Sequence, residues 1–269
     1  MKITNHLISK TIIIFTLLML MFILCACKTS KDSSNDKVKI LYEDVADISL
    51  FMRNGNSQIA QIPLLINKQI EQLTVVNFEG ANFNQDAIKY TYALDSSYQD
   101  CYCYIISLDI DPSRIAQTDD DVIINNLQMN LDNEQLDYHF GRLELKNNLA
   151  LNTDDSIEYR GIGTGYEILD IIDCSVTALE PVLITGIRAS NGLKFTNESQ
   201  YLNSLQKGSI MECRLELDTN SLNKLYYCFD LCIDYQTDGK KNVFYFDIIP
   251  VQTSIKNRLS IFVEQQKGA

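Results

Sequence analysis

A strict alternation of apolar and polar side chains is the feature that most constrains the fold of this chain. Between Tyr226 and Tyr235 ("YYCFDLCIDY") an apolar or aromatic residue stands at every second position, so one side of an extended strand is apolar. Asp238-Gly239 follows, which favours a type I′ turn, and Val243–Ile249 returns as a partner strand. Ile210–Asp218 alternates in the same way. No segment beyond Ala26 shows a sustained helical period, so we predict an antiparallel, all-β fold.

Three pairs of segments in the two halves of the chain resemble one another and occur in the same order. The aligned pairs are Ile70–Val75 with Leu179–Ile184, Tyr102–Ile110 with Tyr227–Tyr235, and Tyr138–Phe140 with Phe244–Phe246. We therefore expect two tandem copies of one β-domain, over residues 38–148 and 156–251, and a C-terminal tail over 252–269. Each copy resembles an immunoglobulin-like β-sandwich in length and strand pattern. One larger sandwich with chance similarity between its strands is the alternative.

The connections between the expected strands differ in length and composition. In the first copy we expect a long loop over Pro112–Gln135, which is our first choice for a recognition surface. The polar segment Asn147–Asp155 is the expected junction between the copies. The glycines of Arg160–Ile168 ("RGIGTGYEI") lack the spacing of a dinucleotide loop and predict a turn or bulge at the entry to the second copy.

The N-terminal 26 residues have the arrangement of a secretory signal peptide. Lys2, His6 and Lys10 form a basic head, and the uncharged apolar run Thr11–Leu24 follows. This run has 14 residues, fewer than the roughly 20 that a membrane-spanning helix needs. An uncleaved membrane helix is the alternative. Residues 27–37 lack large apolar side chains, so we expect a flexible tether there.

The four residues Leu24-Cys25-Ala26-Cys27 resemble the lipobox of bacterial lipoproteins, which reads Leu, a small residue, Gly or Ala, and then Cys. Cys25 departs mildly from this pattern, because Ala, Ser or Thr is commoner at the second position. The resemblance implies diacylglyceryl transfer to Cys27, cleavage after Ala26 and removal of residues 1–26 as a signal peptide. It also implies retention at the extracytoplasmic face of a cell membrane through the lipid anchor.

The chain is acidic, and this limits its partners. Its formal net charge of −12 becomes −14 once Lys2 and Lys10 leave with the leader. Such a surface repels phosphate backbones and anionic lipid headgroups, so we expect no nucleic-acid partner. A cationic ligand, a basic protein or divalent cations match this charge better, although solubility alone also accounts for it.

Six cysteines remain once Cys25 is removed and Cys27 is acylated. Disulfides persist outside the cytoplasm, and residues two or four apart along one strand are roughly 6.6 or 13 Å apart, so any bridge is expected to cross between strands. The candidates for such bridges are Cys101, Cys103, Cys213, Cys228 and Cys232. Buried free thiols that act as small apolar residues are the alternative. We expect no metal, because the cysteine pairs lie mid-strand and His139 is the only histidine beyond the leader.

Patterns that would carry catalysis are missing from the sequence beyond the leader. It holds no G-x-S-x-G, no P-loop and no H-E-x-x-H. A cysteine nucleophile needs a base, and His139 alternates with Tyr138 and Phe140, which predicts an outward position on a strand. We therefore predict no catalytic residues, no cofactor and no enzymatic activity.

Acidic runs in the expected loops are the candidate cation or ligand sites. These residues are Asp119, Asp120, Asp121, Asp154 and Asp155. Calcium prefers clustered oxygen ligands, but neither run has the twelve-residue EF-hand pattern, so we expect at most a weak calcium site. A solvated loop is the alternative.

Together these features predict a lipid-anchored extracytoplasmic protein with a non-catalytic binding or structural role. Its expected partner is a protein or a surface ligand. Two alternatives stay open: an accessory subunit of a membrane-bound secretion, transfer or transport assembly, and an extracytoplasmic enzyme that acts on cell-wall or polysaccharide material.

Overall fold

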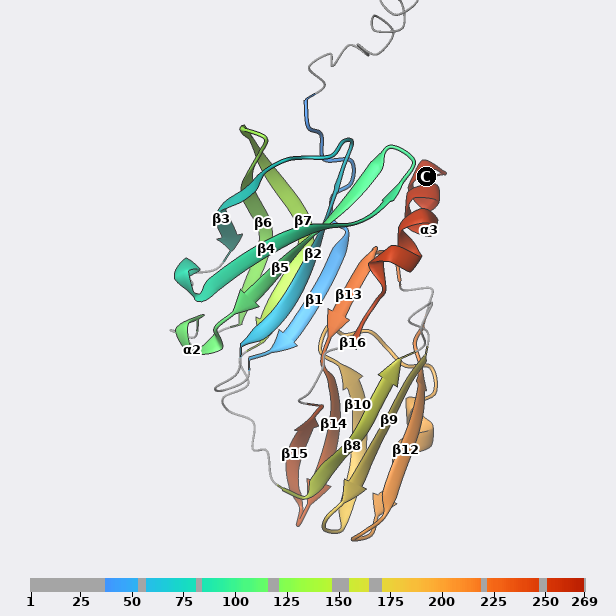
Figure 1. Cartoon of the computed structure of the whole chain (residues 1–269). Coiled ribbons are helices and arrows are strands. Elements are labelled where there is room, and N and C mark those ends of the chain that lie inside the picture. The colour runs from blue at the N-terminus through green and yellow to red at the C-terminus, as the bar shows by residue number, and fades with distance from the viewer. Residues whose placement is uncertain are drawn as a thin grey trace, which may run out of the picture. The chain divides into compact units, whose positions relative to one another are not determined.

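Two large hydrophobic cores, each enclosed by two β-sheets, organise the chain from Val38 onward (Figure 1). Nearly all of the regular structure is strand, which confirms the prediction of an all-β, sandwich-type fold. The computed structural model describes residues 37–52, 57–80, 84–115, 121–146, 155–164, 171–218, 222–246 and 251–268.

The first sandwich packs a six-stranded sheet against a three-stranded sheet. The six strands, in sheet order, are β16 (Val251–Gln252), β13 (Tyr226–Phe229), β1 (Ala46–Phe51), β7 (Glu134–Lys146), β6 (Val122–Leu131) and β3 (Leu73–Gly80). The three strands are β2 (Gln58–Ile66), β5 (Cys101–Ile110) and β4 (Ile88–Tyr98). Its helical segments are η1 (Gln85–Ala87), α2 (Pro112–Ile115) and α3 (Ile255–Lys267).

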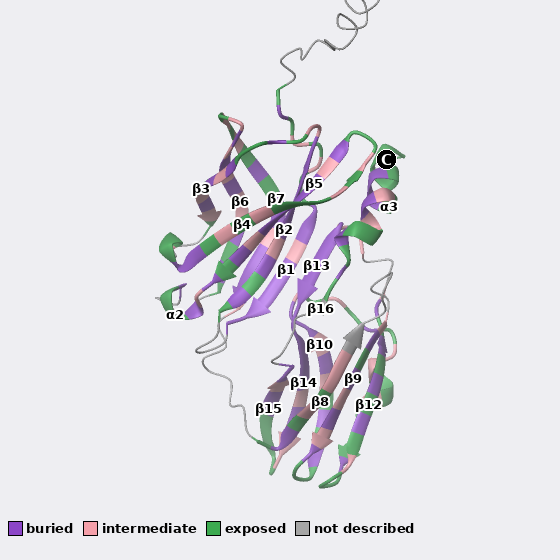
Figure 2. Cartoon of the chain, viewed as in Figure 1, coloured by how far each residue is buried: buried purple, intermediate pink, exposed green. Residues whose placement is uncertain are grey.

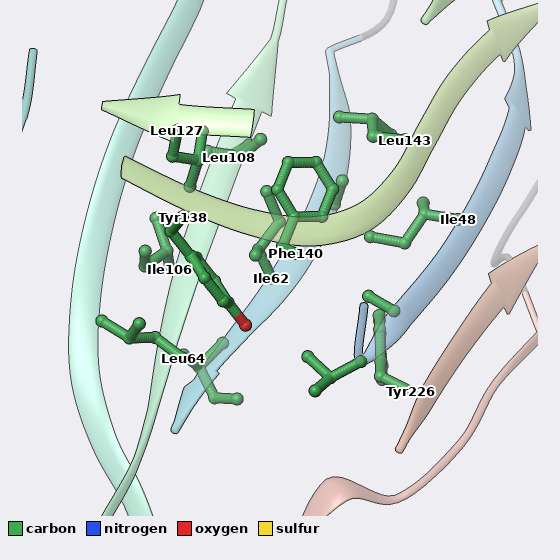
Figure 3. Packing of buried hydrophobic residues seen from close by; sticks show 14 of the residues in the cluster. Ile48, Ile62, Leu64, Ile106, Leu108, Leu127, Tyr138, Phe140, Leu143 and Tyr226 are labelled. Atoms are coloured by element: carbon green, nitrogen blue, oxygen red, sulfur yellow. The ribbon is translucent and has the colours of Figure 1, made fainter. Parts of the chain in front are cut away.

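Side chains from both sheets meet in the first core (Figure 3). Tyr138 and Phe140 of β7 lie beside Ile62 of β2 and Ile106 of β5, and all four are fully buried. Burial of an apolar side chain of this size stabilises the fold by roughly 1.5–3 kcal/mol. The hydroxyl of Tyr138 donates a hydrogen bond to the carbonyl oxygen of Pro63, so its polar atom is satisfied inside the core.

Helix α3 belongs to the first core, although the sequence analysis treats its residues as a tail. Its buried side chains are Ile255, Leu259, Phe262 and Val263. Their spacing of four, three and one places them on one stripe of the helix. The Ser254 side chain caps the first turn by accepting a hydrogen bond from the Asn257 amide at 3.4 Å. The helix packs against β4, and the ring of Phe262 meets Tyr42 edge-on at 5.7 Å.

The expected loop over Pro112–Gln135 in fact contains strand β6, which pairs with β3 and β7. A register shift between Ile124 and Asn126 marks a β-bulge. The bulge shifts the apolar positions of β6 by one residue. The sequence therefore lacks the unbroken alternation that predicts a strand. The buried side chains of β6 are Val122, Ile124, Leu127, Met129 and Leu131.

Strand β1 pairs in parallel with both of its neighbours, β7 and β13, which departs from the purely antiparallel expectation. Gly141 of β7 stands opposite Ala46 of β1 with a φ of +119°. A Cβ atom on Gly141 would lie 2.1 Å from the carbonyl oxygen of Ala46. Only glycine combines this backbone conformation with so close an approach of the two strands.

The second sandwich packs a four-stranded sheet against a three-stranded sheet. The four strands, in sheet order, are β11 (Ser204–Leu205), β10 (Val182–Ala189), β14 (Leu231–Thr237) and β15 (Lys240–Tyr245). The three strands are β12 (Ile210–Glu216), β9 (Ile171–Ala178) and β8 (Ile157–Thr164). The helical turn η2 (Glu198–Tyr201) precedes β11.

Two local predictions are confirmed in this sandwich. Asp238 and Gly239 both have positive φ, 50° and 76°, and they form the two-residue turn between β14 and β15. In β8 the register shifts between Tyr159 and Gly161, which is the bulge expected at the start of Arg160–Ile168.

The ladders of the two sandwiches differ. Strand β14 pairs with β10 and β15, whereas its aligned counterpart β5 pairs with β2 and β4. The counterparts of β10 and β15 are β3 and β7, and both of these pair with β6. The second sandwich therefore does not repeat the strand pairing of the first, and the aligned segments share strand patterning alone.

The alternating run Tyr226–Tyr235 is divided between the two sandwiches at Asp230. Successive side chains of β13 point in opposite directions, and both directions are apolar. Tyr226 and Cys228 belong to the first core, and Tyr227 and Phe229 to the second. The first core therefore includes β13 and α3, both of which lie beyond the expected boundary at residue 148.

Buried polar groups meet at Asp230, where the chain passes from the first sandwich to the second. We call this point the crossing. A carboxylate oxygen of Asp230 accepts a hydrogen bond from the Phe51 amide at 2.7 Å. The Asp230 amide donates to Ser190 Oγ at 2.9 Å, and the Ser190 amide donates to the Asp230 carbonyl at 2.9 Å. Ser190 Oγ in turn donates to the carbonyl of Ser49. These bonds join the end of β1, the end of β10 and the crossing, and they satisfy groups that are cut off from water.

We predict that Asp230→Ala destabilises the protein by about 2–3 kcal/mol, because it leaves the buried Phe51 amide without an acceptor. Asp230→Asn keeps an oxygen in place and is expected to lose less than half as much. Urea unfolding followed by circular dichroism measures both, since the chain has no tryptophan to report. A wild-type midpoint for Asp230→Ala would contradict this account of the crossing.

A second prediction concerns the close approach of β7 and β1. Gly141→Ala is expected to destabilise the protein by about 2–4 kcal/mol, because the new methyl group meets the Ala46 backbone in a strained conformation. Gly161→Ala is the matched control, since a Cβ there has no atom within 4 Å. Equal unfolding midpoints for the two variants would contradict the prediction.

Candidate functional site

The acidic loop candidates are only partly within the described residues. Asp119, Asp120 and Asp154 lie outside them, as does the expected lipidation residue Cys27. Asp121 and Asp155 are both exposed. Within the described ranges, no three His, Cys, Asp or Glu side chains gather closely enough to hold a metal ion.

The six cysteines of the two sandwiches are all buried, and none of them is joined to another in a disulfide. Across the ladders, Cys101 faces Tyr98, Cys103 faces Leu65 and Ser96, Cys228 faces Ile48 and Gln252, and Cys232 faces Arg188 and Tyr245. Burial raises the pKa of Cys101 to about 11 and that of Cys103 further, so both remain protonated thiols at neutral pH. In the ladders, Cys101, Cys103, Cys228 and Cys232 thus have no cysteine directly opposite them.

Cys213 is the exception among the candidates, because it stands directly opposite Cys174. Cys174 is not among the candidate disulfide residues that the sequence predicts. The alternating burial of β9 and β12 shows that both side chains point into the second core. Alternation within the sequence indicates this inward direction for each residue, but the pairing itself depends on the register between two strands.

His139 and the six cysteines of the two sandwiches differ in their exposure to solvent. It is exposed on β7, as predicted, and its Nδ1 lies 2.8 Å from the side-chain oxygen of Asn126. The six cysteines, in contrast, are buried in the cores. A cysteine nucleophile requires a base within hydrogen-bonding reach, and this geometry does not supply one from His139.

A polar groove of about 570 Å³ lies between the three-stranded sheet of the first sandwich and the start of α3. We call it the α3 groove. Its lining residues are Gln61, Thr91, Tyr92, Ala93, Leu94, Asp95, Ile105, Ser107, Gln252, Thr253, Ser254, Ile255 and Lys256. Figure 2 shows that β4, which forms one side of the groove, is largely exposed or half-buried, in contrast to β1 and β13.

Strand register places the groove side chains in rows. Ser107 of β5 stands between Gln61 of β2 and Thr91 of β4, so an amide and two hydroxyls form one row across the sheet. Ile105 and Ala93 form an apolar row directly beside it. Rigid strands therefore hold hydrogen-bonding groups at fixed spacing next to an apolar strip, an arrangement typical of ligand sites.

The side of the groove formed by α3 is fixed by hydrogen bonds. Thr253 Oγ1 accepts from the Tyr227 amide at 2.9 Å and donates to the Leu225 carbonyl at 3.4 Å. Farther along the helix, Glu264 accepts from the side-chain amide of Gln99 at 3.0 Å. The helix is thus attached both to the start of the alternating run and to the turn between β4 and β5.

The groove lining is close to neutral. It contains one carboxylate, Asp95, and one ammonium, Lys256, and its other polar groups are hydroxyls and amides. The arrangement can donate and accept hydrogen bonds in several directions. Its charges do not favour a strongly cationic or anionic ligand over a neutral one.

A second group of polar residues lies on the six-stranded sheet, around the buried carboxylate of Glu144. Ser49 Oγ donates to Glu144 at 3.0 Å, Lys146 lies 3.5 Å from the same oxygen, and Arg142 also donates to it. Lys146 reaches across to the Ser190 carbonyl at 2.6 Å. All three contacts reach the same carboxylate oxygen of Glu144, and Lys146 links this group of residues to Ser190 at the crossing.

Asp47 lies beside this group, opposite Arg142. Desolvation by burial raises its pKa, and the nearby Arg142 and Lys224 only partly offset that effect. One of its carboxylate oxygens has no hydrogen-bond partner among the described residues. Asp47 does not line the α3 groove, so we assign it no part in ligand binding there.

No helix among the described residues is long and apolar enough to cross a bilayer. No protein-family profile matches the chain, and a comparison with curated proteins returns no match.

Proposed function

We propose that the chain is a lipid-anchored lipoprotein of the extracytoplasmic membrane face that binds a ligand without transforming it. Two independent features support this proposal. The leader resembles a lipobox-type signal, with Cys27 as the acylated residue. The first sandwich carries the α3 groove, a preformed concave surface on rigid strands.

The row of Gln61, Ser107 and Thr91 is the observation that carries the binding role. These side chains come from three adjacent strands, and their pairing register holds them side by side. Hydrogen bonds to such groups give specificity for a ligand whose donors and acceptors match their spacing.

The ligand that suits this lining is neutral and rich in hydroxyl groups. A polyanion would meet a chain of formal net charge −12, and a polycation would find only Asp95 as a carboxylate in the groove. An oligosaccharide of the cell envelope offers many hydroxyls and apolar ring faces, which complement the polar row and the strip of Ile105 and Ala93. We therefore propose a neutral glycan as the ligand.

The anchor is tested by Cys27→Ala, with Cys25→Ala as the matched control. Cys27→Ala removes the thiol that is acylated, so we expect loss of lipid labelling and of normal processing. Cys25→Ala places the commoner residue at the second lipobox position and should leave both unchanged. Metabolic labelling with a fatty acid and membrane fractionation measure the outcome, and equal labelling of the two variants would contradict the proposed anchor.

The groove is tested by Thr91→Lys in the detergent-solubilised full chain, with Ser97→Lys as the control. Both residues are exposed on β4, but only Thr91 lines the groove. On an array of neutral oligosaccharides we expect Thr91→Lys to weaken binding by roughly tenfold or more, which corresponds to one or two lost hydrogen bonds. Ser97→Lys should bind as wild type does. Equal binding by the two variants, or no neutral glycan bound by wild type, would contradict the proposed ligand class.

A further inference from the structure

Two cysteines face each other at the centre of one antiparallel ladder of the second sandwich. The ladder of β12 and β9 runs from Ile210 opposite Thr177 to Glu216 opposite Ile171. Cys213 and Cys174 are the middle pair of this ladder. A pair at the centre of a regular ladder is held in register on both sides, so the two side chains stay neighbours.

Their backbone spacing suits a disulfide. Residues directly opposite in an antiparallel pair have Cα atoms about 5.5 Å apart at hydrogen-bonded positions and about 4.5 Å apart at the others. Disulfides form at Cα separations of roughly 4.4–6.8 Å. Either kind of position therefore lets Cys174 and Cys213 join without moving the strands.

The two thiols are neighbours in the reduced protein. Cys174 and Cys213 are both buried in the second core, where they face each other across the ladder. The neighbouring Cys213 side chain, together with burial, raises the pKa of the Cys174 thiol. The pair is therefore close enough to react, but its thiolate is disfavoured while the sheet is closed.

We propose that Cys174 and Cys213 are a disulfide site that fastens the edge strand β12 to β9. The bond forms by exchange with a donor disulfide, either a small molecule or a thiol–disulfide oxidoreductase. One thiolate attacks the donor and gives a mixed disulfide, and the second thiolate displaces the remaining donor sulfur. The donor S–S bond breaks, the protein S–S bond forms, and the two cysteine protons end on two donor thiols.

Strand β12 is the place where a donor reaches the pair. Among the described strands it is the edge of its sheet, paired with β9, and just beyond its end Leu217 forms an isolated bridge with Phe195. Its other side is held by side chains of the η2 region: Asn197 bonds the backbone of Arg214 and Glu216, and the Tyr201 hydroxyl bonds Arg214. A groove of about 610 Å³ lies beside the ladder on the side of the outward residues Asp173, Glu212 and Arg214, whereas the two thiols point into the core. Exchange therefore proceeds when β12 frays or before the sheet closes during folding.

The disulfide joins two strands of one sheet, β9 and β12, and closes a loop that contains β10, η2 and β11, of which β10 and β11 belong to the other sheet. Crosslinking a loop of this size restricts the unfolded chain and stabilises the fold. This inference does not depend on the glycan proposed above, because the α3 groove lies on the first sandwich.

The test is a peptide map of the full chain after incubation with oxidised glutathione, with a dithiothreitol-treated sample as reference. Free thiols are alkylated before trypsin digestion. Cys174 then lies in the peptide Gly161–Arg188 and Cys213 in Gly208–Arg214, so their bridge joins two peptides. The other cysteine pairs lie inside single peptides, Tyr90–Arg114 and Leu225–Lys240, and a bridge within either pair leaves its peptide unlinked.

We expect the linked peptide pair only in the oxidised sample, and a melting temperature higher by on the order of 10 °C than in the reduced sample. Cys174→Ser and Cys213→Ser should each abolish both changes. Recovery of both peptides singly alkylated from the oxidised sample would overturn the proposal, as would a link from Cys213 to any other cysteine. The comparison of oxidised and reduced wild type decides the matter even if a variant fails to fold.

Discussion

The structure depends on one crossing, at which a single alternating run leaves the first sandwich and enters the second. Strand β13 is apolar on both sides, so Tyr226 supports one core and Tyr227 the other. The first polar residue after it is Asp230, and its carboxylate accepts the amide proton of Phe51 at the end of β1. Ser190 at the end of β10 bonds the same crossing. Because these groups are removed from water, each of their hydrogen bonds is stronger than an exposed one, and leaving any of them unmade is costly.

Local patterns in the sequence predicted the local structure well. Asp238-Gly239 gave the correct hairpin because the turn needs two residues with positive φ, and this dipeptide tolerates both. No pattern in the sequence predicts the division of the chain at Asp230. The apolar alternation of Tyr226–Tyr235 continues across this residue, and it would be the same whether the strand stayed in one sheet or changed sheets. Strand β6 was missed because the bulge near Ile124 breaks its alternation. Helix α3 was missed although Leu259 and Phe262 mark its apolar stripe, because the stripe spans only a few turns.

Sites that depend on strand register were beyond the reach of sequence patterns. Gln61, Thr91 and Ser107 are ordinary polar residues on strands, and they become a row only when β2, β5 and β4 pair in one register. Cys174 and Cys213 illustrate the same limit, since spacing along the chain says nothing about which residues stand opposite each other. A one-residue slip in either ladder would send one member of the pair to the opposite face of the sheet.

The overall charge and the groove act on a ligand at different distances. The acidic surface repels polyanions as far as the Debye length of about 8 Å at physiological salt, and it does so whatever their shape. Within the groove, Asp95 and Lys256 offset each other, so discrimination there falls to the direction of hydrogen bonds from hydroxyl and amide groups. A neutral ligand is not repelled by the surface and can satisfy the groups in the groove. In the proposed binding role, charge excludes polyanions and strand register selects the ligand, so the excess of 35 acidic over 23 basic residues does not call for a cationic ligand.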